Sequence, residues 1–160
     1  MAQPRHVLRK TDIALKAFFV AANIEGLTDA NIVRTKESAG KTLPVLICNS
    51  ENALRKRAFN WEVTGSLLLK TDPTDEENNS ALEASDTLED AVIAKMEALV
   101  PADDRPQPLA NAITAAAVAS GQVVGTEFAI SAFTINRVSA GFDEDEIWTF
   151  AVDFTATVIA

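Results

Sequence analysis

The sequence contains one cysteine, one histidine and no tyrosine among its 160 residues. Cys48 has no second cysteine with which to form an internal disulfide, and its apolar neighbours predict a buried side chain in a strand. His6 lies near the start of the chain, where a triad or a histidine-bearing metal site would lack a positioned base. These scarcities argue against cysteine catalysis, histidine catalysis and a structural zinc site.

Long apolar runs and glycine-rich motifs are also missing. No segment approaches the ~18 to 20 apolar residues that cross a bilayer, and no apolar signal core follows Met1. The Gly-x-Gly-x-x-Gly pattern does not occur, and Gly40-Lys41-Thr42 lacks the earlier glycine that wraps phosphates. We therefore expect a soluble protein made in the cytoplasm, with no membrane contact, no cofactor, no metal and no catalytic residues.

Basic residues are scarce in one part of the chain. The last 90 residues contain 3 Lys/Arg and 17 Asp/Glu, whereas the first 70 contain 11 and 6, so the net charge of −9 conceals opposite charges in the two parts. A dedicated DNA-binding surface needs Lys or Arg to neutralise phosphates, which makes non-specific DNA binding improbable for so acidic a chain. Opposite charges on one subunit suit surfaces that meet complementary surfaces, including copies of the same chain.

The N-terminal third predicts one helix and one loop. Apolar residues recur with helical spacing between Ile13 and Ala22, Thr11 or Asp12 can cap this helix, and Gly26 closes the segment. We expect a flexible N-terminus over about residues 1–10. A polar loop with at most fragmentary strand is expected over about residues 27–42.

The rest of the chain alternates strand and helix signals. A capping box over residues 80–83 starts a long helix that Pro101 stops, and the parity of apolar residues changes between Ile130 and Phe133, which indicates a bulge. The predicted strands cover residues 43–48, 59–70, 123–138 and 148–158, and the predicted helices residues 80–99 and 109–119. This order predicts a single α+β domain over residues 1–160, a four-stranded, mainly antiparallel sheet with helices packed on one face.

Two acidic clusters and one basic turn are the charged features that could carry function. The cluster around Asp72 and Glu77 and the cluster from Asp143 to Glu146 could supply oxygen ligands to a hard cation, but neither has calcium-loop spacing. Solvated turns at the ends of elements are the first interpretation, and surfaces that face basic partners in an assembly are the alternative. A carboxylate pair, Glu62 and Asp153, falls on the polar face of predicted strands and can simply point toward water. The interface candidates are Arg34, Lys36, Arg55, Lys56, Arg57, Asp143, Glu144, Asp145 and Glu146.

The order of these segments resembles tail terminator and related head-tail joining proteins of long-tailed bacteriophages. The resemblance rests on an amphipathic N-terminal helix, a polar loop, and the strand Leu-Pro-Val-Leu-Ile-Cys. The strand that begins Asn60-Trp61-Glu62-Val63, an acidic turn, the helix 81–99 and the closing strand Ile147-Trp148-Thr149-Phe150 continue it. The alanine-rich segment 109–120 departs from the family pattern.

That resemblance implies a virion structural protein of the tail or neck without enzymatic activity. Its copies would form a ring, usually a hexamer, that caps the finished tail tube and joins it to the connector or stopper protein, while DNA passes transiently through the lumen. Two alternatives stay open at this point: another neck or minor tail component on the same scaffold, and a small metal-dependent enzyme that uses the acidic clusters.

Overall fold

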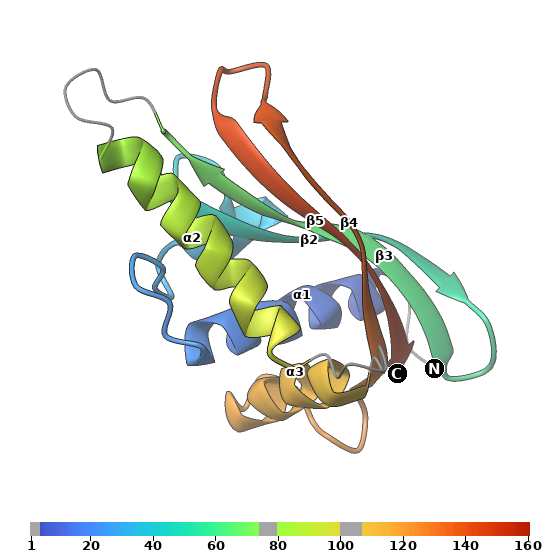
Figure 1. Cartoon of the computed structure of the whole chain (residues 1–160). Coiled ribbons are helices and arrows are strands. Elements are labelled where there is room, and N and C mark those ends of the chain that lie inside the picture. Colours follow the sequence, from blue (N-terminus) through green and yellow to red (C-terminus); the bar gives the residue numbers. More distant parts are fainter. Residues whose placement is uncertain (1–3, 74–79, 100–106) are drawn as a thin grey trace.

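The computed structural model describes residues 4–73, 80–99 and 107–160. In these ranges the chain forms three α-helices, one 3-10 helix and five strands (Figure 1). In chain order they are α1 (Pro4–Ala21), β1 (Ile32–Arg34), η1 (Thr35–Glu37), β2 (Val45–Arg55), β3 (Asn60–Thr71), α2 (Ser80–Glu97), α3 (Gln107–Ala119), β4 (Ala129–Phe142) and β5 (Trp148–Ile159).

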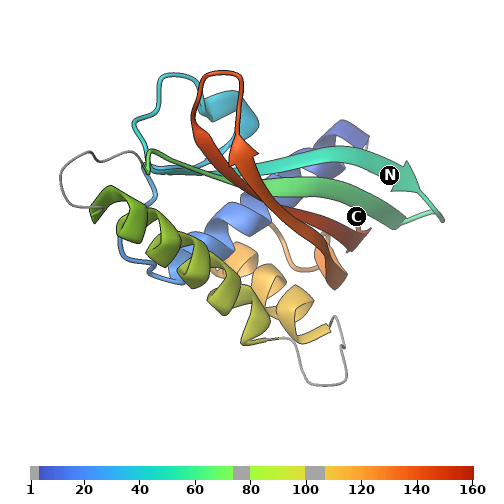
Figure 2. The same cartoon turned by 45° about the horizontal axis from the view of Figure 1, so that its top comes forward.

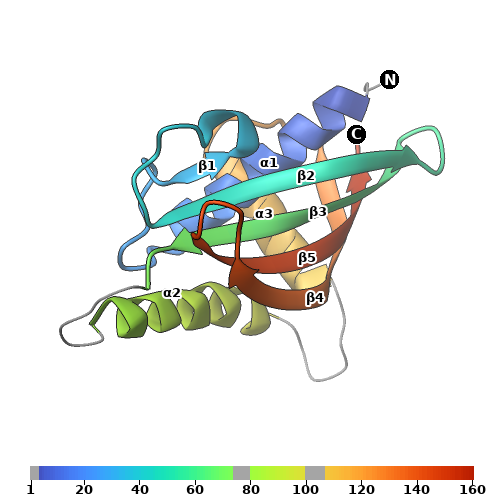
Figure 3. The same ribbon diagram turned by 90° about the horizontal axis from the view of Figure 1, so that it is seen from above.

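The strands form one sheet in the order β1-β2-β3-β5-β4, which Figure 3 shows from above. All neighbours are antiparallel except β1, which pairs parallel to β2 through Ile32–Arg34 and Leu46–Cys48. The α+β class is confirmed, but the prediction of four strands is wrong, because a fifth strand lies in the segment predicted as a polar loop. Three residues are too few for an alternating pattern to predict a strand. β1 is defined instead by its pairing with the edge of β2, which is a contact between distant parts of the chain.

The N-terminal helix is longer than predicted. It begins at Pro4, where a fixed φ favours the first helical turn, and Val7 is fully buried one turn later. Residues 4–10 of the segment expected to be flexible are therefore helical, and residues 1–3 lie outside the described part. Thr11 and Asp12 are not caps: Thr11 lies inside the helix and its hydroxyl donates to the Val7 carbonyl over 2.8 Å.

The main core lies between the sheet and the helices, which occupy the same side of the sheet in Figures 1 and 2. Alternation is regular along β3, where every second residue from Trp61 to Thr71 is buried, and β5 alternates in the same way from Val152 onward. The bulge predicted between Ile130 and Phe133 is confirmed as a register shift between Ile130 and Ala132. The predicted start of the long helix at Ser80 is confirmed. Pro101, which was predicted to stop this helix, lies outside the described residues.

The opposite face of the sheet is polar except at one corner. There Val33, Val45 and Ile47 form a small buried cluster beside Leu43 and Leu68. Burial alternates regularly along β3, but Leu68 is an apolar residue at a position where the sequence pattern expects a polar one. The cluster explains this exception, because the Leu68 side chain packs on the outer face against the β1–β2 corner. The two faces of the sheet therefore differ in character, with a broad apolar face under the helices and a mostly polar face outside.

Candidate assembly surfaces

The turn between β2 and β3 gathers the predicted basic cluster at one end of the sheet. Arg55, Lys56 and Arg57 are exposed there, and Lys56 lies 3.9 Å from Glu62, a contact that solvent weakens. Neither arginine forms an ion pair with any residue in the described ranges. The turn also exposes Phe59, whose accessible fraction of 59% is unusual for an aromatic side chain. We call this the basic end.

Arg34 and Lys36 do not join the basic end. They line a separate cleft of about 500 Å³ between η1, the start of α1 and β2, together with His6 and Arg9. Arg34 is held by Glu37, with 2.7 Å between Nε and Oε1. We call this hollow the basic cleft; the sequence did not predict it, because α1 contributes His6 and Arg9 to a cleft whose other basic residues lie in β1 and η1.

One carboxylate lies in the basic cleft. Asp12 accepts a hydrogen bond of 2.8 Å from the backbone N–H of Ser50, at the position along β2 where β1 has ended. The carboxylate thus replaces a missing strand partner. Burial raises the pKa of the Asp12 carboxyl from 3.8 to about 6, although hydrogen bonding by Ser50 and the Arg34 guanidinium lower it.

The turn between β4 and β5 holds the predicted acidic cluster at the other end of the sheet. Glu144, Asp145 and Glu146 are exposed, whereas Asp143 organises the turn. Its Oδ1 accepts the N–H groups of Asp145 and Ile147 over 2.9 and 3.0 Å, and its Oδ2 lies 3.2 Å from Lys70 Nζ. The hydrogen bond from Ile147, helped by Lys70, lowers the pKa of Asp143. We call this the acidic end.

An exposed aromatic residue precedes the acidic turn. Phe142 is 59% exposed and packs edge-on against Trp148, with ring centroids 5.1 Å apart. Trp148 is itself fixed by a 2.9 Å hydrogen bond from its indole N–H to Glu89 of α2. Phe142 lies opposite Trp148 at the end of β4, and the helices leave it exposed. The predicted strand ended at residue 138, so the sequence did not single out Phe142.

The basic and acidic ends are separated by the full length of the central strand. Asn60, at the start of β3, pairs with Ile159, and Thr71, at its end, pairs with Trp148. Eleven steps of a strand span ~36 Å. Figure 1 shows the two turns pointing away from each other, with the C-terminus and the start of α1 near the basic end. The basic turn and the acidic turn therefore lie at opposite ends of the sheet, while Lys70, also from the basic part of the sequence, pairs with Asp143 at the acidic end.

The outer face between these ends carries the carboxylate pair considered above. Asp153 accepts a hydrogen bond of 2.7 Å from Ser66 and pairs with Arg137 over 3.0 Å, whereas Glu62 contacts Lys56. Asp153 pairs in register with Ser66, which is four residues along β3 from Glu62, or ~13 Å. The two carboxylates are too far apart to share a proton.

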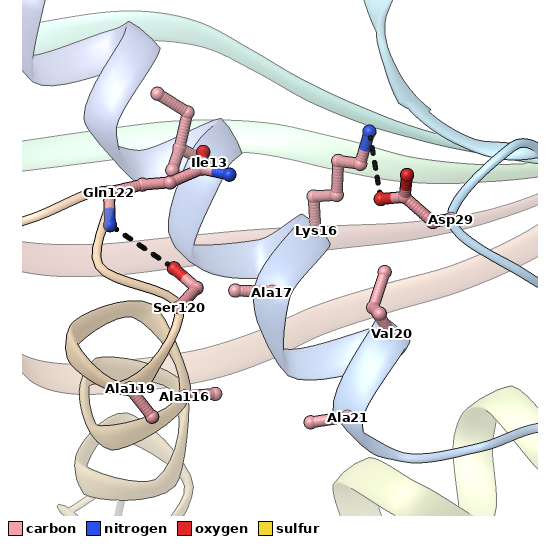
Figure 4. Close-up of a pocket in the computed structure, with 10 residues that line it drawn as sticks. All are labelled: Ile13, Lys16, Ala17, Val20, Ala21, Asp29, Ala116, Ala119, Ser120 and Gln122. Atoms are coloured by element: carbon pink, nitrogen blue, oxygen red, sulfur yellow. Dashed lines mark hydrogen bonds and ion pairs between the residues drawn. The ribbon is translucent and has the colours of Figure 1, made fainter.

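A shallow groove of about 310 Å³ runs between α1 and α3 (Figure 4). Alanines and Val20 form most of its wall, and its charged groups are Lys16 and Asp29, which pair with each other over 3.5 Å. Such a wall suits helix packing and offers no convergent set of reactive groups.

Searches of the described residues for two other kinds of site give no candidate. These residues contain no group of three or more His, Cys, Asp or Glu side chains arranged to hold a metal ion; residues 75–77 of the first acidic cluster lie outside them. Among the described helices, none combines the length and the apolar content that spanning a membrane requires. Cys48 is fully buried, as predicted, and burial raises the pKa of its thiol.

Comparison with known proteins gives no family assignment. No protein-family model matches the chain, and no curated protein matches it significantly. What the chain does must be argued from the surfaces described above.

Proposed function

We propose that this chain is a noncatalytic structural subunit of the head-tail junction of a long-tailed bacteriophage. Its copies form a ring, a hexamer in the family it resembles, which caps the tail tube and joins it to the connector or stopper protein. The protein belongs to the tail or neck of the virion and is assembled in the host cytoplasm.

The observation that carries this proposal is the placement of opposite charges at opposite ends of one sheet. Arg55, Lys56 and Arg57 lie at one end and the turn from Asp143 to Glu146 at the other. A contact between unlike ends is heterologous, and heterologous contacts produce closed rings when the rotation between neighbours closes. A stiff sheet between the two ends fixes that rotation, because it holds both contact sites in one body.

The remaining charges suit a channel for DNA rather than a DNA-binding site. Exposed carboxylates of α2, including Glu83, Asp86 and Asp90, add to the acidic surface. A lumen lined by carboxylates would repel phosphates, and DNA could pass without the counterion release that drives binding. We propose that DNA passes through this lumen and forms no stable complex with the chain.

The proposal is tested in a phage that encodes the chain. Removing its gene is expected to give tails of uncontrolled length or tails without heads, and adding the purified protein to isolated tubes should place one ring at one end of each tube in negative-stain images. Tails of normal length that carry heads in the deletion strain would refute the role. If tails of normal length form but do not join to heads, the chain would instead be another component of the neck.

A further inference from the structure

A pocket at the basic end has the composition of a docking site for an aromatic side chain. Its volume is about 560 Å³, and Phe59 and Ile159 contribute exposed apolar surface, with Ile159 43% exposed. His6 and Lys10 of α1 line it from one side, and Glu127 is the one acidic side chain in the lining. The turn that holds Phe59 also carries Arg55, Lys56 and Arg57. An apolar floor beside four cationic side chains, Lys10 and the three basic residues of this turn, favours a ligand that is apolar at its tip and acidic around it.

The acidic end of the same chain has the matching composition. Phe142 projects a mostly exposed ring, and four consecutive carboxylates follow it directly in the sequence. Phe142 closes β4, opposite Trp148 in the ladder, and the turn beyond it is tied by Asp143. An aromatic side chain on a preformed hairpin loses little conformational freedom when it docks, which is the property of an interface anchor.

We infer that Phe142 of one copy inserts into the Phe59–Ile159 pocket of a second copy, with Glu144, Asp145 and Glu146 lying against the basic end. The occupant is a second copy of this chain because the chain itself carries both halves of the contact, which are opposite in charge and each expose an aromatic ring. The two halves lie ~36 Å apart on one stiff sheet. A chain therefore cannot fill its own pocket, and each copy keeps one free end after the first contact.

This inference rests on the proposed function in one respect: it identifies the contact that would repeat around the ring. Each contact would bury one aromatic ring at its centre, and the charged groups would form its rim. Anchors of this kind commonly account for most of the binding free energy, whereas rim charges mainly set specificity and association rate.

The first test uses two variants that each lose one half of the contact. Phe142→Ser removes the anchor and Phe59→Ser removes the pocket wall; both side chains are more than half exposed, so thermal unfolding should be nearly unchanged. By sedimentation velocity, the wild type is expected to form assemblies larger than dimers as concentration rises. Each variant alone should associate at least ~10-fold more weakly.

Mixing the two variants distinguishes this contact from every symmetric one. In an equal mixture, the intact acidic end of Phe59→Ser can bind the intact basic end of Phe142→Ser, but the remaining ends are both damaged. The mixture should therefore form heterodimers and stop there. Either variant assembling like the wild type, a mixture without heterodimers, or a wild type that stays monomeric at all concentrations would overturn the inference.

Charge reversal gives an independent readout. Arg57→Glu or Glu144→Lys alone should weaken association, and the double variant should recover part of it; raising the salt concentration should weaken wild-type association. Glu25→Lys, which reverses an exposed carboxylate in the loop after α1, is the matched control and should have no effect. Equal losses in the control and in Glu144→Lys, or no recovery in the double variant, would contradict the contact.

The contact and the proposed function can fail separately. Head-to-tail assembly in solution together with normal tails in the deletion strain would retain the contact and reject the phage role. A ring on tail tubes that forms equally well from Phe142→Ser would retain the role and reject the contact.

Discussion

Replacing Asp12 by asparagine is expected to raise folding stability at neutral pH and to flatten its pH dependence. In the wild type the carboxylate is mostly buried and accepts the Ser50 N–H over 2.8 Å. Asparagine keeps an acceptor oxygen at this position and carries no charge. The Ser50 hydroxyl, which acts on the Asp12 carboxylate in the wild type, can accept from the new amide.

The sign and size of the effect follow from the raised pKa. Between pH 3.8 and about 6 the unfolded chain has released the Asp12 proton and the folded chain has not, so rising pH favours unfolding. Stability from this group is complete below the unfolded pKa and is lost as pH rises through the folded pKa. The difference between 3.8 and about 6 corresponds to about 3 kcal/mol.

The assay is urea denaturation of wild type and Asp12→Asn at intervals from pH 4 to pH 8. The stability of the variant relative to wild type should grow with pH and level off above pH 7, since other titrating groups cancel in the difference. Asp12→Ala, which also cannot titrate, leaves the Ser50 N–H without its acceptor and should be less stable than Asp12→Asn by ~1–3 kcal/mol at every pH. A difference between wild type and Asp12→Asn that does not change with pH would refute the reasoning.

Four further substitutions, of which Gly141→Ala is a control, test the packing of the sheet and the acidic turn by chemical denaturation. Gly65→Ala should cost at least ~2 kcal/mol, because a Cβ there would collide with the Asn49 carbonyl oxygen, whereas Gly141→Ala, with open space around it, should change stability by less than ~1 kcal/mol. Trp61→Phe should cost less than ~1 kcal/mol despite the lost volume, because it removes an indole N–H that is buried without a partner in the described structure; a loss above ~2 kcal/mol would contradict this reasoning. Asp143→Asn should destabilise the protein at pH 7 and lose this effect as pH falls, since a lowered pKa stabilises only the ionised form; an effect that persists fully at low pH would contradict the role of the carboxylate.

Local sequence signals predicted the elements whose residues interact with near neighbours. The alternation from Trp61 to Leu69 predicted β3, the spacing of Ser80 and Glu83 predicted the start of α2, and the change of parity after Ile130 predicted the bulge in β4. Each pattern follows from a repeat of about 2 or 3.6 residues that one face must bury. Seven of the nine interface candidates were predicted in two charged turns, and these turns exist, whereas Arg34 and Lys36, expected in a polar loop, lie in β1 and η1. The role of all nine in assembly remains a prediction.

Composition and periodicity, which the sequence carries by itself, determined the α+β class, most element positions and the separation of basic from acidic residues along the chain. Only the tertiary structure decided that Ile32–Arg34 becomes a strand, that the first helix begins at Pro4, and which charged residues come together. It also decided that Phe59 and Phe142 stay exposed at opposite ends of the sheet. These features depend on contacts between distant segments, such as β3 pairing along its full length with β5, and a local repeat contains no information about which distant segment will cover a side chain.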